Sequence, residues 1–290
     1  MGVSRRMIQK LTRASGIRLN GRPAYLGRKL RAGDVVTARL AFSEDAVLPG
    51  VPMELRIVYE DAELLVVDKP AGVLVHPVGS SEAPTLAHGI AHHFGILGLH
   101  AKVRPVHRLD RNTSGLVLFA KSAFAHQALD RQLRERQLRR SYLAIVSGVP
   151  ASGEQVIDAP IGPHPHDPHL RAVVATGGDR AVTRFRVVEA LDGAALLEVD
   201  LETGRTHQIR VHLAHLGHPL LGDGQYGGST RSEIGRQALH AASLAFRQPV
   251  TNQLLELTSS LPEDLEGIRR NLAGMAGRPD AQERTESMSP

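Results

Sequence analysis

A single carboxylate, Asp110, lies between two arginines in the stretch HRLDRNTSG, residues 107–115. Positive charge from Arg108 and Arg111 favours the ionised form of the carboxyl group between them, because that form gains from the attraction. An ionised aspartate can act as a nucleophile, as a base or as one partner of an ion pair. The stretch therefore has two interpretations, a catalytic carboxylate beside an anionic substrate and a surface ion-pair loop.

A polar turn follows the acid and leads into a predicted buried strand. Thr113, Ser114 and Gly115 are residues typical of tight turns, and they can fix the orientation of the acid. The stretch SGLVLFAKS is a short apolar run, which predicts a buried strand. The acid is therefore expected at the mouth of a strand, where a functional group has rigid support.

A second cationic position stands before a predicted helix. RTHQIRVHLAHLG, residues 205–217, predicts a helix of about three turns that ends at Gly217. The free N–H groups at the start of a helix favour anions. Arg205 at that start can bind a carboxylate or a phosphate through two parallel hydrogen bonds. Spacing alone does not show that Arg205 and Asp110 converge.

The elements that must position these residues are mostly strands. Apolar runs predict strands in ELRIVYEDAELLVVDKPAG, SYLAIVSG, LHAASLAF and NQLLELTSSLP, and residues 181–202 predict a hairpin that turns at Asp192 and Gly193. Helices are predicted over residues 85–95 and within residues 122–140. Strands and helices do not alternate as regular βαβ units. This favours an α+β fold with a large mixed, mainly antiparallel sheet and flanking helices.

Composition indicates the class of partner. The chain has 290 residues, a formal net charge of +5 and a sequence pI near 9.9. A basic balance of this kind points first to nucleic acid. The absence of cysteine excludes disulfides, thiolate catalysis and cysteine-based metal sites. Because no signal-peptide core and no apolar run of about eighteen residues occurs, we expect a cytoplasmic protein without a membrane segment.

Three motifs suggest a cofactor or a metal but lack the required context. GDGQYG, residues 222–227, matches the G-x-G-x-x-G pattern, yet no buried strand is predicted before it and no helix after it. One group of histidines lies in a proline-broken loop, where the geometry is loose. A second group recurs every three residues, and such steps drift around a helix of 3.6 residues per turn. These histidines are His164, His166, His169, His212, His215 and His218. We therefore expect neither a cofactor nor a metal.

The chain is predicted to contain four parts. Residues 1–45 form a small basic module with a short helix and a turn at Asn20. Residues 46–53 carry two prolines and form a linker, and residues 54–262 form the main domain. Residues 263–290 are charged and poor in large apolar side chains, which predicts a disordered tail.

Several stretches, in order from about residue 55 to residue 260, resemble motifs of the RluA-type pseudouridine synthases. HRLDRNTSG is similar to the family signature, with Asn112 where the family commonly has aspartate. DKPAGVLVHP resembles the first motif of the family, and YLAIVSG resembles the strand that carries its active-site tyrosine. TGRTHQIRVHLAHLGHPLLGD resembles its basic motif and following helix, and LHAASLAF resembles its late strand. IRLNGRPAYLGRKLRAGDVV, within residues 1–45, resembles a reduced S4-type RNA-binding domain.

The resemblance implies a pseudouridine synthase-like fold and the isomerisation of a uridine within RNA. The glycosidic bond between C1′ and N1 breaks, the uracil turns, and C5 bonds to C1′. Asp110 would be the essential carboxylate, and the sequence leaves open whether it attacks the sugar or abstracts a sugar proton. Tyr142 would lie against the uracil, and Arg205 would pair with Asp110. Arg108 would fill the place of the target nucleotide, which must leave the base stack.

The resemblance also implies a set of residues that bind the substrate. His107 would support the loop that carries the acid. The arginines before Tyr142 have two interpretations, a track for RNA phosphates and a solvated helix face. The residues predicted to bind the substrate are Arg108, His107, Thr113, Ser114, Arg139 and Arg140.

The expected partner is RNA, with large-subunit rRNA as the first choice and tRNA as the alternative, and we expect a monomer. Two other functions compete. A non-catalytic RNA-binding or assembly protein on the same fold would not need Asp110, Tyr142 and Arg205 together. A hydrolase that uses the acid and a histidine on a small substrate would not need a basic surface or an S4-like module.

Overall fold

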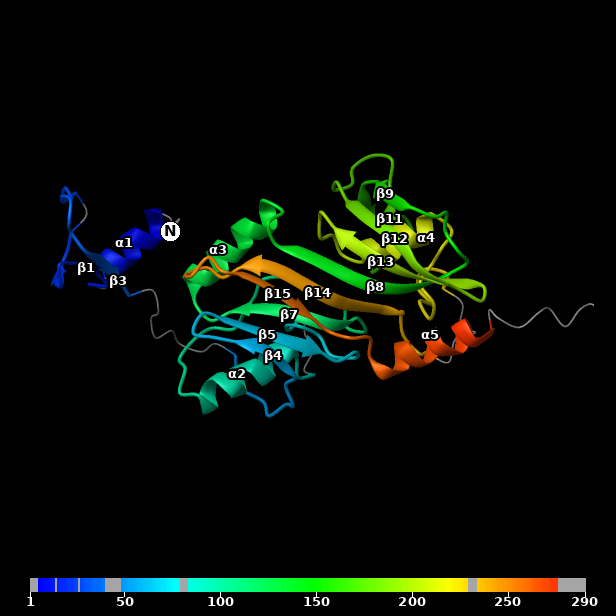
Figure 1. Ribbon diagram of the computed structural model, residues 1–290, viewed down its shortest axis with the longest axis horizontal. Helices are drawn as coiled ribbons and strands as arrows, with labels where there is room; N and C mark the ends of the chain where they lie inside the picture. Colours follow the sequence, from blue (N-terminus) through cyan, green and yellow to red (C-terminus); the bar gives the residue numbers. More distant parts are fainter. Residues whose placement is uncertain are drawn as a thin grey trace, which may run out of the picture. The chain divides into compact units, whose positions relative to one another are not determined.

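The computed structural model describes residues 5–13, 15–25, 27–39, 48–78, 83–228 and 234–275 (Figure 1). The chain divides into two compact units. Unit 1 comprises Met1–Arg139 with Ser243–Thr258, and unit 2 comprises Arg140–Ala242 with Ser259–Pro290. Within the described ranges, no helix is both long and apolar enough to cross a bilayer.

Unit 1 combines helices with short and long strands. Its helices are α1 (Arg5–Arg13), α2 (Leu86–Ile96) and α3 (Ala123–Arg134). Its strands are β1 (Ile17–Leu19), β2 (Arg22–Pro23), β3 (Val36–Ala38), β4 (Ile57–Glu60), β5 (Leu64–Lys69), β6 (Arg104–Pro105), β7 (Ser114–Ala120), β15 (Leu254–Thr258) and the second half of β14 (Leu239–Arg247).

The N-terminal part of unit 1 is α1 followed by a three-stranded sheet in the order β2-β1-β3. The predicted turn between β1 and β2 is confirmed, because Leu19 pairs with Arg22 and the two residues between them have positive φ. Asn20 has φ 52° and Gly21 has φ 80°, the left-handed pair that a two-residue hairpin turn requires. The Asn20 side chain also accepts the N–H of Val35 at 2.8 Å. This amide therefore ties the turn to the residue just before β3.

Unit 2 is built mainly from long antiparallel strands. Its strands are β8 (Arg139–Ser147), β9 (Glu154–Asp158), β10 (Ile161–Pro163), β11 (Arg171–Val173), β12 (Val182–Leu191), β13 (Ala194–Leu201) and the first half of β14. Its helices are α4 (Gln208–His215) and α5 (Glu263–Met275). The predicted hairpin is confirmed, since β12 and β13 pair from Thr183 and Leu201 down to Leu191 and Ala194 around the turn at Asp192 and Gly193.

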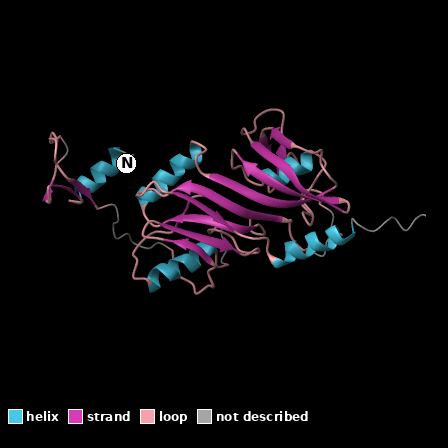
Figure 2. Cartoon of the chain, viewed as in Figure 1, coloured by secondary structure: helices cyan, strands magenta, loops and turns pink. Residues whose placement is uncertain are grey.

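Among the described residues, ten strands share one sheet in the order β4-β5-β7-β14-β8-β13-β12-β9, with β6 beside β7 and β15 beside β14 (Figure 2). The pairs β4·β5, β5·β7, β8·β13 and β12·β13 are antiparallel. A second small sheet joins β10 to β11. This arrangement confirms the predicted α+β fold with a large, mainly antiparallel sheet.

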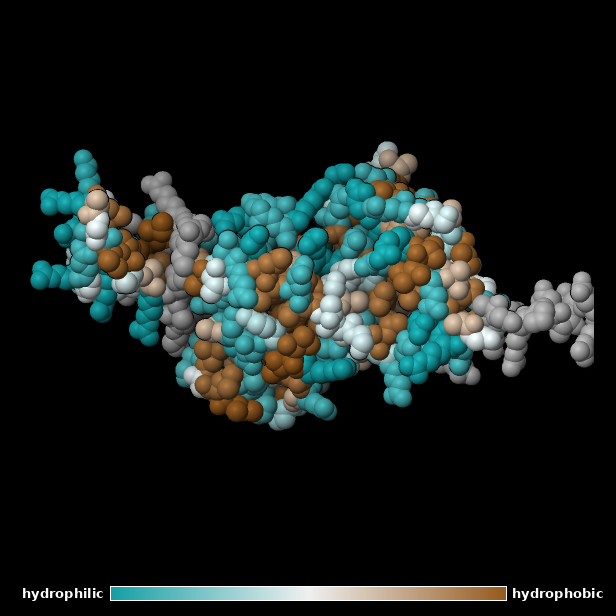
Figure 3. All heavy atoms as spheres, viewed as in Figure 1, coloured by the Kyte–Doolittle hydropathy of each residue, from teal (hydrophilic) through white to brown (hydrophobic). Residues whose placement is uncertain are grey.

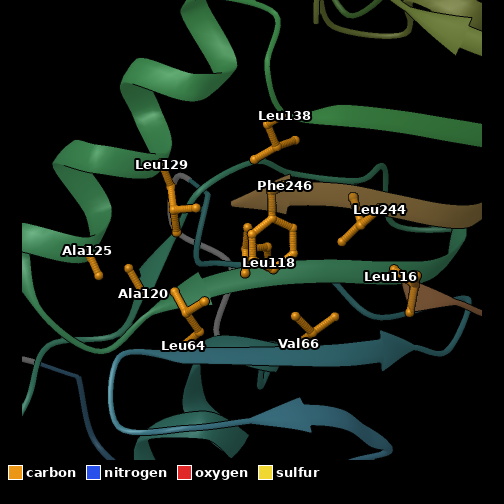
Figure 4. Close-up of a cluster of buried hydrophobic side chains, with 10 residues drawn as sticks. All are labelled: Leu64, Val66, Leu116, Leu118, Ala120, Ala125, Leu129, Leu138, Leu244 and Phe246. Carbon is orange, nitrogen blue, oxygen red and sulfur yellow. The ribbon is translucent and has the colours of Figure 1, made fainter. Parts of the chain in front are cut away.

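The core of unit 1 is aliphatic, as the low aromatic content predicts. Every residue of β7 is buried, which is the pattern of a strand covered on both faces. Leu118 of this strand lies in a cluster with Leu129 of α3 and Phe246 of β14 (Figure 4). All three residues are fully buried. This packing makes β7 a rigid support for the residues that precede it.

Helix α2 buries one face and leaves its end uncovered. Leu86, Ile90 and Phe94 repeat at four-residue steps and are buried. Ile96, at the last position, and Leu97, which follows it, are 72% and 55% exposed. Hydrophobic side chains gather over α2 on the face drawn in Figure 3. The helix thus covers the core with its buried stripe, and its C-terminal end is apolar and open.

The structure differs from the sequence prediction at the start of the tail. Residues 263–275, which were expected to be disordered, form α5. Leu265 is fully buried, and Ile268 and Leu272 pack on the same core cluster of unit 2. The spacing of these three residues gives α5 one apolar face despite its high charge. The rest of the predicted tail, residues 276–290, lies outside the described residues.

Candidate active site

Asp110 lies in the connection between β6 and β7. Burial alternates along this connection, with Leu109 4% exposed and Arg108 and Arg111 exposed on either side of the half-buried acid. The N–H of Thr113 donates to the Asp110 carbonyl at 3.1 Å and closes a turn directly before β7. The leucine therefore anchors the loop, and the half-buried acid stands between two exposed arginines in the sequence.

His107 attaches this loop to β7 where the backbone pairing of β6 with β7 ends. The N–H of Val106 donates to the Leu118 carbonyl at 2.9 Å. The N–H of Leu118 then donates to Nε2 of His107 at 3.2 Å. The imidazole thus takes the place of a strand carbonyl. This contact accounts for the support that the sequence predicted, and a contact of His107 with substrate stays a prediction.

A buried lysine fixes the peptide that follows Asp110. Lys69 at the end of β5 is fully buried, and its Nζ donates to the carbonyls of Pro70, Val73 and Arg111 at 2.9, 2.8 and 2.9 Å. The Arg111 carbonyl also accepts the N–H of Gly72 at 2.9 Å. An ammonium has three donors, and a buried one needs polar partners. Lys69 therefore joins the DKPAG turn to the loop of the acid.

Gly72 meets a conformational requirement of this join. Its φ is +86°, a left-handed conformation that residues with a Cβ adopt at a cost. In this conformation its N–H reaches the Arg111 carbonyl. The DKPAG stretch, residues 68–72, thus forms a turn that supports the loop of the acid.

Unit 2 holds Tyr142 and Arg140 on β8. Tyr142 is 4% exposed and pairs with Val199 of β13. Arg140 is 8% exposed, and its guanidinium donates to the Thr203 carbonyl at 3.4 Å. A Cβ at Gly204 would lie 3.1 Å from the same guanidinium, so glycine gives Arg140 the room to lie against this loop.

Arg205 lies in the loop between β13 and α4. Its Nε donates to the Arg180 carbonyl at 3.1 Å, and its Nη1 lies 3.5 Å from a carboxylate oxygen of Asp179. The Arg205 side chain is 42% exposed, and that of Asp179 is 73% exposed. An ion pair this open to water contributes little stability and exchanges readily. The expected pairing of Arg205 with Asp110 stays a prediction.

The residues that sequence analysis nominated fall into two groups. Unit 1 holds His107, Arg108, Asp110, Thr113, Ser114 and Arg139. Unit 2 holds Arg140, Tyr142 and Arg205. Thr113 and Ser114 are buried at the start of β7, which gives them a structural place in the loop, whereas Arg139 is exposed.

Sequence reasoning missed two buried polar residues that hold these groups in place. One is Lys69, and the other is Gln208, whose side chain accepts the N–H of Arg205 at 2.9 Å. A lysine at the end of the apolar run ELLVVDK was a usable signal, because a charge there must find buried partners. The Arg205-x-x-Gln208 spacing was another, since glutamine three residues on often caps a backbone N–H.

Comparisons with known proteins show the family to which this chain belongs. Residues 63–215 match a family model described as RNA pseudouridylate synthase. The chain is 40% identical over 269 residues to the "uncharacterized RNA pseudouridine synthase YjbO" of Bacillus subtilis, covering 91% of this chain and 94% of that protein. It is 41% identical over 272 residues to ribosomal large subunit pseudouridine synthase D of Pseudomonas aeruginosa, covering 87% of this chain and 84% of that protein.

The solved structure of human RNA pseudouridylate synthase domain containing 1 is similar with a TM-score of 0.60 and 26% identity. That similarity covers 80% of this chain and 98% of the human chain. The chain therefore belongs to the RNA pseudouridylate synthase family and is an isomerase that acts on uridine in RNA. The predicted resemblance to the RluA-type enzymes is confirmed.

We expect Lys69→Met to loosen the loop that carries Asp110. The variant removes the ammonium and leaves three carbonyls without this donor, which lowers the unfolding free energy by about 2–3 kcal/mol. Urea denaturation measures this loss, and the rate of uridine conversion should fall with it. Lys102→Met removes an exposed lysine and serves as the control. Equal stability and activity of the two variants would contradict the role of Lys69.

We expect the stability of unit 2 to fall in mild acid because of His212. Burial lowers the pKa of this histidine below its ordinary value of 6.5, although the hydrogen bond to the Ala159 carbonyl opposes the shift. Below about pH 6.5 the unfolded chain binds a proton that the folded chain excludes. The unfolding free energy is therefore highest above that pH and decreases as the pH falls through it.

Urea denaturation from about pH 7 to about pH 5 tests this linkage. His212→Gln should show a weaker decrease than the unsubstituted protein, because glutamine does not titrate. His169→Gln changes an exposed histidine and should keep the full decrease. The idea fails when His212→Gln and His169→Gln lose stability in parallel.

Proposed function

We propose that this enzyme isomerises uridines in structured RNA with Asp110 as its essential carboxylate. The observation that carries the proposal is the setting of Asp110. The acid is half-buried on a loop that Lys69 fixes through the Arg111 carbonyl, and exposed Arg108 and Arg111 flank it. A rigid loop keeps a carboxylate in a productive orientation, and flanking cations favour an anionic polymer as substrate.

The reaction leaves the composition of the uridine unchanged, because the hydrogen lost from C5 is balanced by a proton gained at N1. The C1′–N1 bond breaks, a C5–C1′ bond forms, the proton on C5 leaves, and N1 gains a proton. We assign Asp110 to the sugar and Tyr142 to the uracil, where the tyrosine packs on the base. Arg205 pairs with Asp110 and keeps it ionised in this scheme.

Access to the base requires extrusion of the nucleotide from the stack. We assign Arg108 to the vacated place, because its side chain is exposed two residues before the acid. A planar guanidinium suits this role, since it can stack on the neighbouring bases and bind phosphates at the same time. His107, Thr113 and Ser114 hold the loop, and Arg139 and Arg140 bind the RNA.

The proposed substrate is large-subunit ribosomal RNA. Support comes from the relative in Pseudomonas aeruginosa, whose name gives the ribosomal large subunit as its target and which is 41% identical to this chain. The basic N-terminal module, with α1 and the sheet β2-β1-β3, is proposed as an S4-like RNA-binding part. We also propose that the enzyme acts as a monomer in the cytoplasm.

We expect Asp110→Asn to abolish conversion while the variant folds normally. The substitution nearly preserves shape and removes the charge, so the rate should fall by at least about a thousandfold. The measurement is tritium release from rRNA transcripts that carry the label at C5 of uridine, because C5 loses its hydrogen in the reaction. Binding of the RNA should persist, since Arg108 and Arg111 are unchanged.

Asp130→Asn is the matched control for this variant. Asp130 is also followed by an arginine, but it lies on α3 and forms an exposed ion pair with Arg134. The control should release tritium at the unsubstituted rate. Comparable release by Asp110→Asn would remove Asp110 from the mechanism.

We expect deletion of the gene to remove pseudouridine from large-subunit rRNA. Mapping of pseudouridines in total RNA, with and without the gene, identifies the target positions directly. Reintroduction of the unsubstituted gene should restore them, and the gene for Asp110→Asn should not. Loss of sites from tRNA alone would overturn the substrate assignment and leave the role of Asp110 standing.

A further inference from the structure

The side chain of Gln208 is a buried amide at the first position of α4, with 2% of the residue exposed. Its Oε1 accepts the N–H of Arg205 at 2.9 Å and the hydroxyl of Thr203 at 2.8 Å. The N–H of Gln208 in turn donates to the Arg205 carbonyl at 3.1 Å. Gln208 therefore binds both the N–H of Arg205, through its side chain, and the carbonyl of Arg205, through its own N–H.

The other end of the amide is bound to the start of β12. Its Nε2 donates to the Val182 carbonyl and to Oγ1 of Thr183, both at 3.0 Å. The N–H of Val182 donates to Oγ1 of Thr203 at 2.9 Å, which closes the ring of contacts. A carbonyl can only accept and a backbone N–H can only donate, so the orientation of the amide is fixed by its neighbours. The strand thereby sets the position of the loop.

The hydrogen-bond network extends from Gln208 through Thr183 to His212, and the donor and acceptor of each bond can be assigned. The Ala159 carbonyl accepts from Nε2 of His212 at 3.0 Å, so Nδ1 is the acceptor and Thr183 donates its hydroxyl to it at 2.8 Å. Thr183 and His212 are fully buried. Oγ1 of Thr183 is therefore left to accept from Gln208. The chain of bonds that ends on Arg205 is complete with an uncharged imidazole and an uncharged amide.

We propose that Gln208 is a positioning residue for Arg205, and this inference rests on the role that the proposed function gives to that arginine. The backbone of Arg205 is fixed by the amide, and its Nε donates to the Arg180 carbonyl, two residues before Val182. The backbone of Arg205, through Gln208, and its guanidinium, through the Arg180 carbonyl, are thus both bound to the segment that enters β12. The guanidinium stays accessible for a carboxylate, while hydrogen bonds to Gln208 hold the backbone of the arginine.

The variant Gln208→Glu, which replaces the amide nitrogen by an oxygen, tests this role through the pH dependence of the conversion rate. In Gln208→Glu one oxygen still accepts the Arg205 N–H, but the other faces the Val182 carbonyl in place of a donor. A protonated carboxyl donates to that carbonyl and restores the network, whereas a carboxylate is repelled by it. Burial shifts the titration of a carboxyl towards neutral pH.

The conversion rate of Gln208→Glu, relative to the unsubstituted enzyme, should therefore fall at least about tenfold from about pH 6 to about pH 8.5. Titratable groups that both enzymes share and that lie outside this network cancel in the ratio. A ratio that is independent of pH would overturn the proposal.

A double-mutant cycle tests whether the amide acts through the arginine. Gln208→Leu should lower kcat by about 10- to 100-fold with little change in KM, because a displaced group costs reactivity rather than binding. In the Arg205→Lys background the same change should have a much smaller effect. An equal effect in both backgrounds would show that Gln208 does not act through Arg205.

Gln132→Leu is the matched control. Gln132 is also a buried amide, 7% exposed, and it bridges the N–H and carbonyl of Arg247 at 2.8 and 2.7 Å in unit 1. Its loss should destabilise the fold similarly without changing kcat. If Arg205→Lys and Arg205→Ala convert uridine normally, the proposed function of Arg205 fails. If they do not, and Gln208→Leu behaves like Gln132→Leu, only the present inference fails.

Discussion

The setting of the candidate acid depends on one buried charge. The ammonium of Lys69 lies without exposure to water at the end of β5, and it is stabilised by the carbonyls of Pro70, Val73 and Arg111. Burial of a cation without such partners would lower the free energy of unfolding by several kcal/mol, because the charge loses its hydration. The DKPAG turn and the Asp110 loop must therefore form together, because each contributes oxygens that the lysine requires.

The same solution recurs in the loop of the acid and at Arg205 in the second unit. His107 accepts the N–H of Leu118 beside the acid, and Gln208 accepts the N–H of Arg205 in the second unit. In each case a buried polar side chain binds a backbone group and leaves the functional side chain accessible. This division satisfies the rule that buried polar groups need partners, and it leaves Asp110 partly exposed and Arg205 exposed.

The elements with strong local signals were predicted correctly. The Asn20–Gly21 turn, the hairpin at Asp192 and the end of α4 before Gly217 follow from turn chemistry and helix stops that act over a few residues. The predicted start of this helix at Arg205 was wrong, because α4 begins at Gln208 and Arg205 lies in the loop before it. The helix α5 was missed, because its composition is that of a tail and only contact with the core of unit 2 gives its apolar face a partner. Local composition does not report such contacts.

The sequence by itself determined the family, the α+β class and the order of the motifs around Asp110, Tyr142 and Arg205, since residue types in a fixed order are a property of the chain alone. Only the tertiary structure decided what Lys69 and Gln208 do. Lys69 binds a carbonyl 42 residues away, and Gln208 binds Val182, 26 residues earlier in the chain. The packing of segments distant in the sequence determines which groups a buried polar side chain binds. These partners are therefore known only from the tertiary structure.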